Sequence, residues 1–260
     1  MLEVESARQL IAERALGRTI ARVDAPDAWF IKRGATPTTL RTALRGHTLT
    51  DARRIGKQLL VDTDGGRGPT LGLHLGMSGR VVIDGDEAGD PLIYASNRDV
   101  PEWRRFRLRF SDGGALWLRD PRRLGAVELD PDESRFGPDA SKLSAAALRN
   151  VVRRSRAPLK AVLMDQSRVA GLGNLLTDEA LWRAGLDPAR PANDLSDQEI
   201  AALHRAIRTT VRVLGNRGGS HTGDLMEARV RGGRCPRDGA ELLRRQVGGR
   251  TTFSCPLHQR

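Results

Sequence analysis

The stretch Pro158–Pro188, PLKAVLMDQSRVAGLGNLLTDEALWRAGLDP, predicts two helices joined by a glycine turn. Lys160 to Asp165 carries apolar residues at a spacing that favours a short helix. Leu175 to Ala184 resumes a helical apolar period, and Pro188 ends it. The rest of the chain is interpreted outward from this pair of helices.

The turn between the two helices, Ala170 to Asn174, is a candidate phosphate site. Gly171 and Gly173 permit a positive φ or a close approach of the backbone to a partner. Unpaired N–H groups at the start of the second helix and the helix dipole both favour an anion there, and Asn174 adds a side-chain N–H. The same pattern also fits a plain helical hairpin in an all-α core.

The charge of the chain points to a polyanionic partner. The 260 residues are enough for two domains, and the net charge of +11 comes almost entirely from arginine. Nucleic acid is the simplest such partner, although a ribosomal or acidic-lipid partner fits the charge alone. Aromatic residues make up only 4% of the chain, which argues against single-strand binding by rows of stacking side chains.

The N-terminus and the cysteines indicate the compartment. The sequence has no apolar run of about 18 residues and no basic-then-apolar N-terminus, so we expect no membrane span and no signal peptide. The two cysteines both lie near the C-terminus and do not make a disulfide framework. We therefore expect a cytoplasmic, nucleoid-associated protein that acts as a monomer.

The order of signals along the chain predicts an α+β multidomain fold in three parts. An opening helix ends at Gly17, and short strands separated by glycine turns then predict a β-sandwich with a flanking helix over residues 1–130. Residues 131–228 are predicted to be helical, with a capping box at Ser196–Glu199 that starts the last helix. Residues 229–260 are predicted to form a basic β-hairpin. The expected strands are Thr19–Val23, Gln58–Asp62, Gly72–Leu75, Arg80–Ile83, Arg105–Phe110 and Ala115–Leu118.

Two short glycine-containing segments in the first part are candidate contact loops. The first is HLGMSGR at His74–Arg80, and the second is DPRRLG at Asp120–Gly125. A Met exposed at such a turn can wedge into a base stack, although Met77 by itself fits a core residue better. The arginines of the second loop by themselves fit ordinary solvated charge.

The C-terminus carries a metal-ligand pattern. Cys235 and Asp238 form one pair, Cys255 and His258 form a second, and each pair has two residues between its members. Pairs of this spacing on two knuckles bring four ligands into a tetrahedron, and His and Asp are both permitted zinc ligands. We therefore expect one Zn²⁺ per chain; the alternative is a hairpin that has lost its metal and keeps its shape by packing.

Together these motifs resemble the formamidopyrimidine-DNA glycosylase / endonuclease VIII family of base-excision repair enzymes, over almost the whole chain. The resemblance rests on the Gly-x-Gly-Asn turn of a helix–two-turns–helix segment, on HLGMSG and DPRRLG, on RRIGKQLL at Arg53–Leu60, and on a hairpin tip, GGRTTF, at Gly248–Phe253. It implies binding of damaged or abasic double-stranded DNA. The family's pattern has four cysteines in its zinc finger, and here Asp238 and His258 replace two of them.

The resemblance also assigns roles to residues of this chain. It implies that the turn and the hairpin tip grip phosphates beside the damaged nucleotide, that a lysine binds phosphate at the lesion, and that three side chains fill the hole left by the flipped nucleotide. Leu124 stands where the family has an aromatic residue, so it can push into the stack but cannot stack on a base. The phosphate-gripping residues are then Gly171, Gly173, Asn174 and Arg250, and the lysine is Lys57. The three side chains that fill the hole are Met77, Arg122 and Leu124.

The N-terminus departs from the family. The family's enzymes begin, after removal of Met, with a Pro-Glu pair whose proline amine attacks C1′ to form a Schiff base. Here Glu3-Val4-Glu5 matches the later Glu-Val-Glu, so the catalytic pair is missing and the Met1 amine falls about 7 Å short. Either the segment shifts so that Met1 and Glu3 take over, or the chemistry is lost, or the start codon is misassigned.

Two functional hypotheses remain from the sequence. The first is a DNA glycosylase with AP-lyase activity that uses a displaced N-terminal amine. The second is a catalytically silent binder of damaged or abasic DNA, acting as a repair accessory protein. An RNA-binding role for the helix–two-turns–helix segment is disfavoured by the contact loops and the hairpin.

Overall fold

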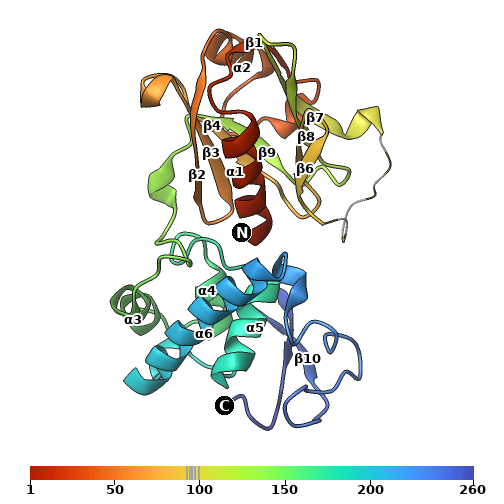
Figure 1. Ribbon diagram of the computed structural model, residues 1–260. Coiled ribbons are helices and arrows are strands. Elements are labelled where there is room, and N and C mark those ends of the chain that lie inside the picture. Colours follow the sequence, from red (N-terminus) through yellow and green to blue (C-terminus); the bar gives the residue numbers. More distant parts are fainter. Residues whose placement is uncertain (92, 94–95, 97, 99) are drawn as a thin grey trace. The chain divides into compact units, whose positions relative to one another are not determined.

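The computed structural model describes the chain except residues 92, 94–95, 97 and 99 (Figure 1). Its contacts divide the chain into two compact units. The N-terminal unit is Glu3–Glu133, and the helical unit is Ser134–Arg260 together with Met1 and Leu2. The C-terminal hairpin thus clusters with the helices, and the three-part division into residues 1–130, 131–228 and 229–260 stays a prediction.

Within its described residues, the N-terminal unit contains two antiparallel sheets. One has the strand order β1-β7-β8-β5-β6 and the other β2-β3-β4-β9. The helices and strands of this unit are α1 (Leu2–Arg14), β1 (Ile20–Asp24), η1 (Ala28–Phe30), α2 (Pro37–Leu44), β2 (Leu49–Ile55), β3 (Gln58–Thr63), η2 (Asp64–Gly66), β4 (Leu71–His74), β5 (Arg80–Ile83), β6 (Asp86–Gly89), η3 (Pro101–Trp103), β7 (Arg104–Phe110), β8 (Ala115–Arg119) and β9 (Ala126–Leu129).

Both sheets and both helices of this unit contribute to one apolar core. Helix α1 buries Val4, Ala7 and Ile11, which recur at helical spacing on one face. Leu59 and Val61 of β3 point into the same core, in which Phe106 of β7 is also buried. The predicted β-sandwich with a flanking helix is therefore confirmed.

In the N-terminal unit, the sequence failed to predict the strands β2, β6 and β9. The six expected runs correspond to β1, β3, β4, β5, β7 and β8. β2 has the sequence LTDARRI, in which a polar and a charged residue separate the buried Leu49 and Ala52. The alternation of apolar and polar residues that predicts a strand is therefore weak in β2. Helix α2 was also missed, although Thr36 forms a capping box with Thr39 and Pro37 occupies the first turn.

The helical unit has its own core, formed by the faces of four helices. Its elements are η4 (Glu133–Arg135, at the junction of the units), α3 (Ala145–Arg153), α4 (Leu159–Met164), α5 (Asn174–Ala184), η5 (Ala192–Asp194), α6 (Asp197–Asn216), η6 (Ser220–Thr222), β10 (Leu243–Val247) and β11 (Arg250–Ser254). The predicted helix pair is confirmed as α4 and α5. The expected capping box at α6 also forms, with Ser196 and Glu199 each bonding to the other's backbone N–H.

The hairpin β10–β11 is held to α5 by a small separate cluster. Trp182 of α5 packs in it with Phe253 of β11 and with both cysteines. Both glycines at the tip of the hairpin, Gly248 and Gly249, have positive φ. A Cβ on Gly248 would lie 2.8 Å from the Cβ of Ala161, so only glycine allows the tip to press this closely on α4.

Candidate nucleic-acid interface

The glycine turn leads directly into the uncapped start of α5. Gly171 has φ +110° and donates its N–H to Oε1 of Gln166 at 2.9 Å, so this particular N–H is engaged inside the turn. Gly173 is the N-cap residue and has no side chain to cover the first N–H groups of α5. One N–H group of the predicted phosphate site is therefore used inside the turn, and the phosphate site itself stays a prediction.

The tip of the C-terminal hairpin reaches the same helix start. The carbonyl oxygen of Thr251 accepts a hydrogen bond from Nδ2 of Asn174 at 3.1 Å and another from Nζ of Lys160 at 3.3 Å. Arg250, the residue before Thr251, is exposed. Asn174 is thus bonded to the hairpin residue that directly follows Arg250.

A buried ion network lies beneath this meeting point. Nζ of Lys160 lies 2.7 Å from Oδ1 of Asp178, and both side chains are fully buried. The other carboxylate oxygen of Asp178 bonds to Arg229. Lys160 also donates to the hydroxyl of Thr252 at 2.7 Å. Burial lowers the pKa of Lys160 although Asp178 opposes this shift. The network ties α4, α5 and β11 together.

The two contact loops of the N-terminal unit are organised by one buried carboxylate, Asp120. It accepts the hydroxyl of Ser78 at 2.5 Å, which joins the first loop to the second. Within the second loop it accepts the N–H groups of Leu124 and Gly125, both at 2.7 Å, and that of Arg122 at 3.1 Å. Asp120 is fully buried, so these bonds fix the loop conformations.

The side chains carried by these loops point outward. Met77 is 49% exposed and Leu124 is 45% exposed, large fractions for apolar side chains. Arg122 is exposed as well. Of the two interpretations of Met77, the core interpretation is therefore wrong. The two loops, both held by Asp120, therefore expose two apolar side chains and one guanidinium group.

Lys57 stands at a hairpin tip in the same unit. It lies in the turn between β2 and β3, directly after Gly56, which has φ +60°. Nearby on β2, Arg54 donates to Glu5 of α1 at 2.9 Å, which fixes this end of the hairpin against the helix. Lys57 is partly exposed.

The four expected metal ligands come together in the hairpin. Their ligand atoms all lie within 4.8 Å of one another. Nδ1 of His258 is 3.7 Å from Sγ of Cys235 and 2.8 Å from Oδ2 of Asp238, which is 3.1 Å from Sγ of Cys255. Ligand atoms around tetrahedral zinc are separated by about 3.3–3.8 Å, so the cluster fits the ion.

Second contacts orient these ligands. Trp182 donates its indole N–H to Sγ of Cys235 at 3.3 Å, and its carbonyl oxygen lies 3.3 Å from Nε2 of His258. A carbonyl at Nε2 places the proton there and leaves Nδ1 available as a ligand. The residues present can therefore hold a metal, with α5 supplying the outer contacts.

The N-terminus belongs to the helical unit. Met1 is only 5% exposed and belongs to that unit's core, and Leu2 packs against the same core. Glu3 begins the N-terminal unit in the first turn of α1. The Met1 backbone is thus held by packing and is not a loose tail.

Known proteins resemble the chain along its whole length. The family model for the formamidopyrimidine-DNA glycosylase N-terminal domain matches residues 1–127, and that for the helix–two-turns–helix domain matches residues 136–223. The chain belongs to the formamidopyrimidine-DNA glycosylase family. A formamidopyrimidine-DNA glycosylase from Roseiflexus is 32% identical over 99% of this chain and 98% of its own. One from Paracoccus denitrificans is 34% identical over the same shares.

Solved structures of the same family match the fold of this chain. The Lactococcus lactis enzyme in complex with DNA containing FAPY-dG matches 100% of this chain and 99% of its own, with a TM-score of 0.81 and 27% identity. A complex of that enzyme with abasic-site DNA matches equally well, at 26% identity. In the part of this chain that is described, no helix is long and apolar enough to cross a membrane.

Several residues that organise the candidate contact segments of the two units were not predicted from the sequence. No role was predicted for Asp120 within DPRRLG, although its Asp-Pro turn was an available signal. Lys160 and Asp178 had no such signal, because a charged residue in an amphipathic helix is more often solvated. Gln166 holds the glycine turn through side-chain bonds to Gly171 and to the carbonyl of Leu172.

Proposed function

We propose that this protein is a DNA repair glycosylase that binds damaged or abasic duplex DNA. The observation that carries the proposal is the convergence of Asn174 and the Thr251 carbonyl at the uncapped start of α5, beside exposed Arg250. Backbone N–H groups, an amide and a guanidinium at one point make a phosphate grip. Family membership and the exposed Met77 and Leu124 support duplex binding with a wedge.

We further propose glycosylase and AP-lyase chemistry at the N-terminal amine. The amine of Met1 attacks C1′ of the damaged nucleotide, the bond from C1′ to the base breaks, and a proton passes to the leaving base. At an abasic site the amine adds to the C1′ aldehyde and water leaves as the Schiff base forms. An α-amine with a pKa of roughly 7.7–8.0 has an appreciable neutral fraction at physiological pH. Glu3 is the candidate proton carrier.

A second candidate function is silent binding of damage. Leu2 stands where the family's Pro-Glu-Leu-Pro start carries its second proline, so the catalytic Pro-Glu pair that precedes it is missing. Met1 is buried in the core of the helical unit. An amine held there must still come within about 3–3.5 Å of C1′ to react. Silent binding predicts intact recognition of an abasic site without covalent chemistry.

Borohydride trapping on abasic duplex separates the two candidates. A trapped complex that disappears when the N-terminus is chemically blocked supports the Met1 mechanism. Trapping that survives the block and is lost in Lys57→Ala assigns the nucleophile to that lysine. No trapping, with duplex binding retained, supports the silent reader. Absence of any preference for abasic over intact duplex contradicts both functions.

Zinc completes the proposal. We propose one Zn²⁺ per chain, held by Cys235, Asp238, Cys255 and His258, whose ligand atoms cluster within 4.8 Å. Four protein ligands would leave no open position on the ion, so its contribution would be structural: it would close the hairpin and present Arg250 from a folded tip. The protein is proposed to act as a monomer on the DNA, without a membrane partner.

A further inference from the structure

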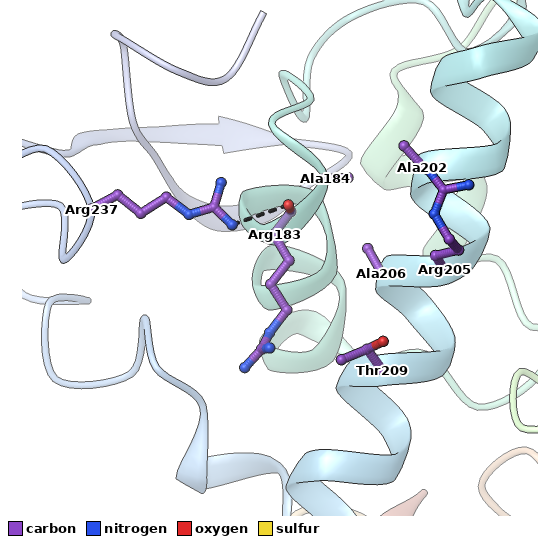
Figure 2. Close-up of a pocket in the computed structure, with 7 residues that line it drawn as sticks. All are labelled: Arg183, Ala184, Ala202, Arg205, Ala206, Thr209 and Arg237. Carbon is purple, nitrogen blue, oxygen red and sulfur yellow. Dashed lines mark hydrogen bonds between the residues drawn. The ribbon is translucent and has the colours of Figure 1, made fainter.

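A basic hollow lies at the C-terminal end of α5, between that helix, α6 and the loop before β10 (Figure 2). Its volume is about 320 Å³, and small side chains and guanidinium groups line it. The residues that line it are Arg183, Ala184, Ala202, Arg205, Ala206, Thr209 and Arg237. None of them has a part in the phosphate grip described above.

A second hollow of about 520 Å³ adjoins the first and shares Arg205 and Thr209 with it. It also contains Arg208 and Arg212 of α6, together with His204, Val211 and Ser141. Arg205, Arg208 and Arg212 follow the spacing i, i+3, i+7, so they lie on one face of α6. Arg205 lines both hollows, and Arg208 and Arg212 line the second. We call these three residues the arginine ridge.

In the described part of the chain, the charges of the arginine ridge are not balanced by carboxylates of the protein. Neither hollow is lined by an aspartate or a glutamate. By contrast, the neighbouring Arg183 is paired with Glu179 at 2.8 Å and with Asp224 at 2.5 Å. Among the described residues, no carboxylate forms an ion pair with Arg205, Arg208 or Arg212, and all three are exposed.

Helix electrostatics does not explain the ridge. Like charges three and four residues apart on a helix destabilise it by about 0.2–0.5 kcal/mol per pair. Only Arg212 lies close enough to the end of α6, at Asn216, to be compensated by the helix dipole. An external anion would compensate all three guanidinium groups.

The ridge is separate from the phosphate grip. The grip is at Asn174, the first residue of α5, and the hollow contains Ala184, the last. Eleven helical residues span about 16 Å. One phosphate group therefore cannot reach both places.

We propose that the arginine ridge binds the phosphate backbone of a second nucleic-acid segment while the grip holds the first. Seven residues of helix separate Arg205 from Arg212 by about 10 Å along the axis of α6, so the three guanidinium groups can meet more than one phosphate of a strand. Guanidinium groups recognise phosphate in a bidentate manner. The hollows offer alanine, threonine and valine but no aromatic anchor, so charge and not a peptide side chain supplies the affinity.

The consequence is direct transfer between DNA segments. A protein with one DNA site must release its duplex before it takes another, so its dissociation rate does not depend on competitor concentration. A protein with two sites captures the competitor first. The labelled duplex then leaves faster as the competitor concentration rises. The inference rests on the proposed duplex binding, which is measured separately in the same experiment.

The test follows dissociation of a labelled abasic-analogue duplex from the full chain at increasing concentrations of intact duplex. The variant Arg208→Gln/Arg212→Gln keeps side-chain length and helix propensity but removes two charges. Arg41→Gln/Arg45→Gln removes two exposed arginines in the N-terminal unit and is the matched control. We expect the dissociation rate of the labelled duplex to rise with competitor concentration in the wild type and in the control. In the ridge variant this rise should be smaller by about five-fold or more.

Equilibrium affinity for the abasic duplex should change by less than about two-fold in the ridge variant, because the grip is intact. Native mass spectrometry should detect one chain with two short duplexes in the wild type. A wild-type rate independent of competitor, or an unchanged rise in the ridge variant, overturns the proposal. Acceleration by a poly-glutamate peptide but not by duplex also overturns it, in favour of an acidic protein partner. Loss of abasic binding in the wild type contradicts the proposed function instead.

Discussion

Nζ of Lys160 and the carboxylate of Asp178 are 2.7 Å apart, with both side chains fully buried. The same carboxylate also holds Arg229. One negative charge therefore balances two cations under the point where the hairpin meets α5. Because Lys160 also donates to Thr251 and Thr252, the ion network fixes the strand that carries Arg250.

This shared carboxylate predicts unequal effects of removing its partners. Asp178→Asn leaves two buried cations unpaired and should lower the free energy of unfolding by about 3–5 kcal/mol. Lys160→Met should cost clearly less, since Arg229 stays paired with Asp178. Urea unfolding measures both, and Arg168→Met, which breaks an exposed pair with Asp165, should cost less than about 1 kcal/mol. Equal losses at Lys160 and Asp178 would contradict the shared-carboxylate interpretation.

The Asp120 carboxylate should control recognition of damage. Asp120→Asn replaces one accepting oxygen by an N–H₂ group that faces the N–H groups of Leu124 and Gly125, so about 1–3 kcal/mol of stability should be lost. The ratio of affinities for abasic over intact duplex should fall, because the loops that carry Met77 and Leu124 lose the hydrogen bonds that fix their conformation. Asp130→Asn, in an exposed turn of the same unit, is the control and should leave the ratio unchanged.

Arg250 should appear in the salt dependence of binding. Arg250→Ala removes one phosphate contact, so the slope of log K against log salt should fall by about one unit. Titrations of abasic duplex at several salt concentrations give the slope. Arg41→Ala, which removes an exposed arginine of α2, should leave it unchanged. An Arg250→Ala protein with wild-type affinity and slope would remove the hairpin tip from the DNA site.

The hairpin should contain one zinc ion with a tryptophan reporter beside it. Metal analysis of protein purified without chelator should give one Zn²⁺ per chain, lost in His258→Ala and in Asp238→Ala. The ring of Trp182 lies 6.0 Å from that of His258, so chelation should change tryptophan fluorescence, and Trp182→Phe should abolish that change. A metal-free protein with an unchanged hairpin would show that packing alone holds this element.

Local patterns in the sequence predicted the elements whose hydrogen bonds and buried faces depend on residues close together in the chain. The apolar period of Leu175–Ala184 predicted α5, because a helix buries one face at a fixed spacing. The capping box at Ser196 and the glycine turn were predicted for the same reason, since both are satisfied by near neighbours along the chain. The family resemblance rested on motifs of this local kind.

Only the tertiary structure decided which distant groups meet. Asn174 bonds to Thr251, 77 residues later, and Ser78 bonds to Asp120, 42 residues later. Periodicity states that a side chain is buried but not what it is buried against, so neither pair follows from spacing. The burial of Lys160 is the clearest case. A lysine in an amphipathic helix is normally solvated, and here it is buried because the fold supplies a carboxylate and two oxygen acceptors around its ammonium group.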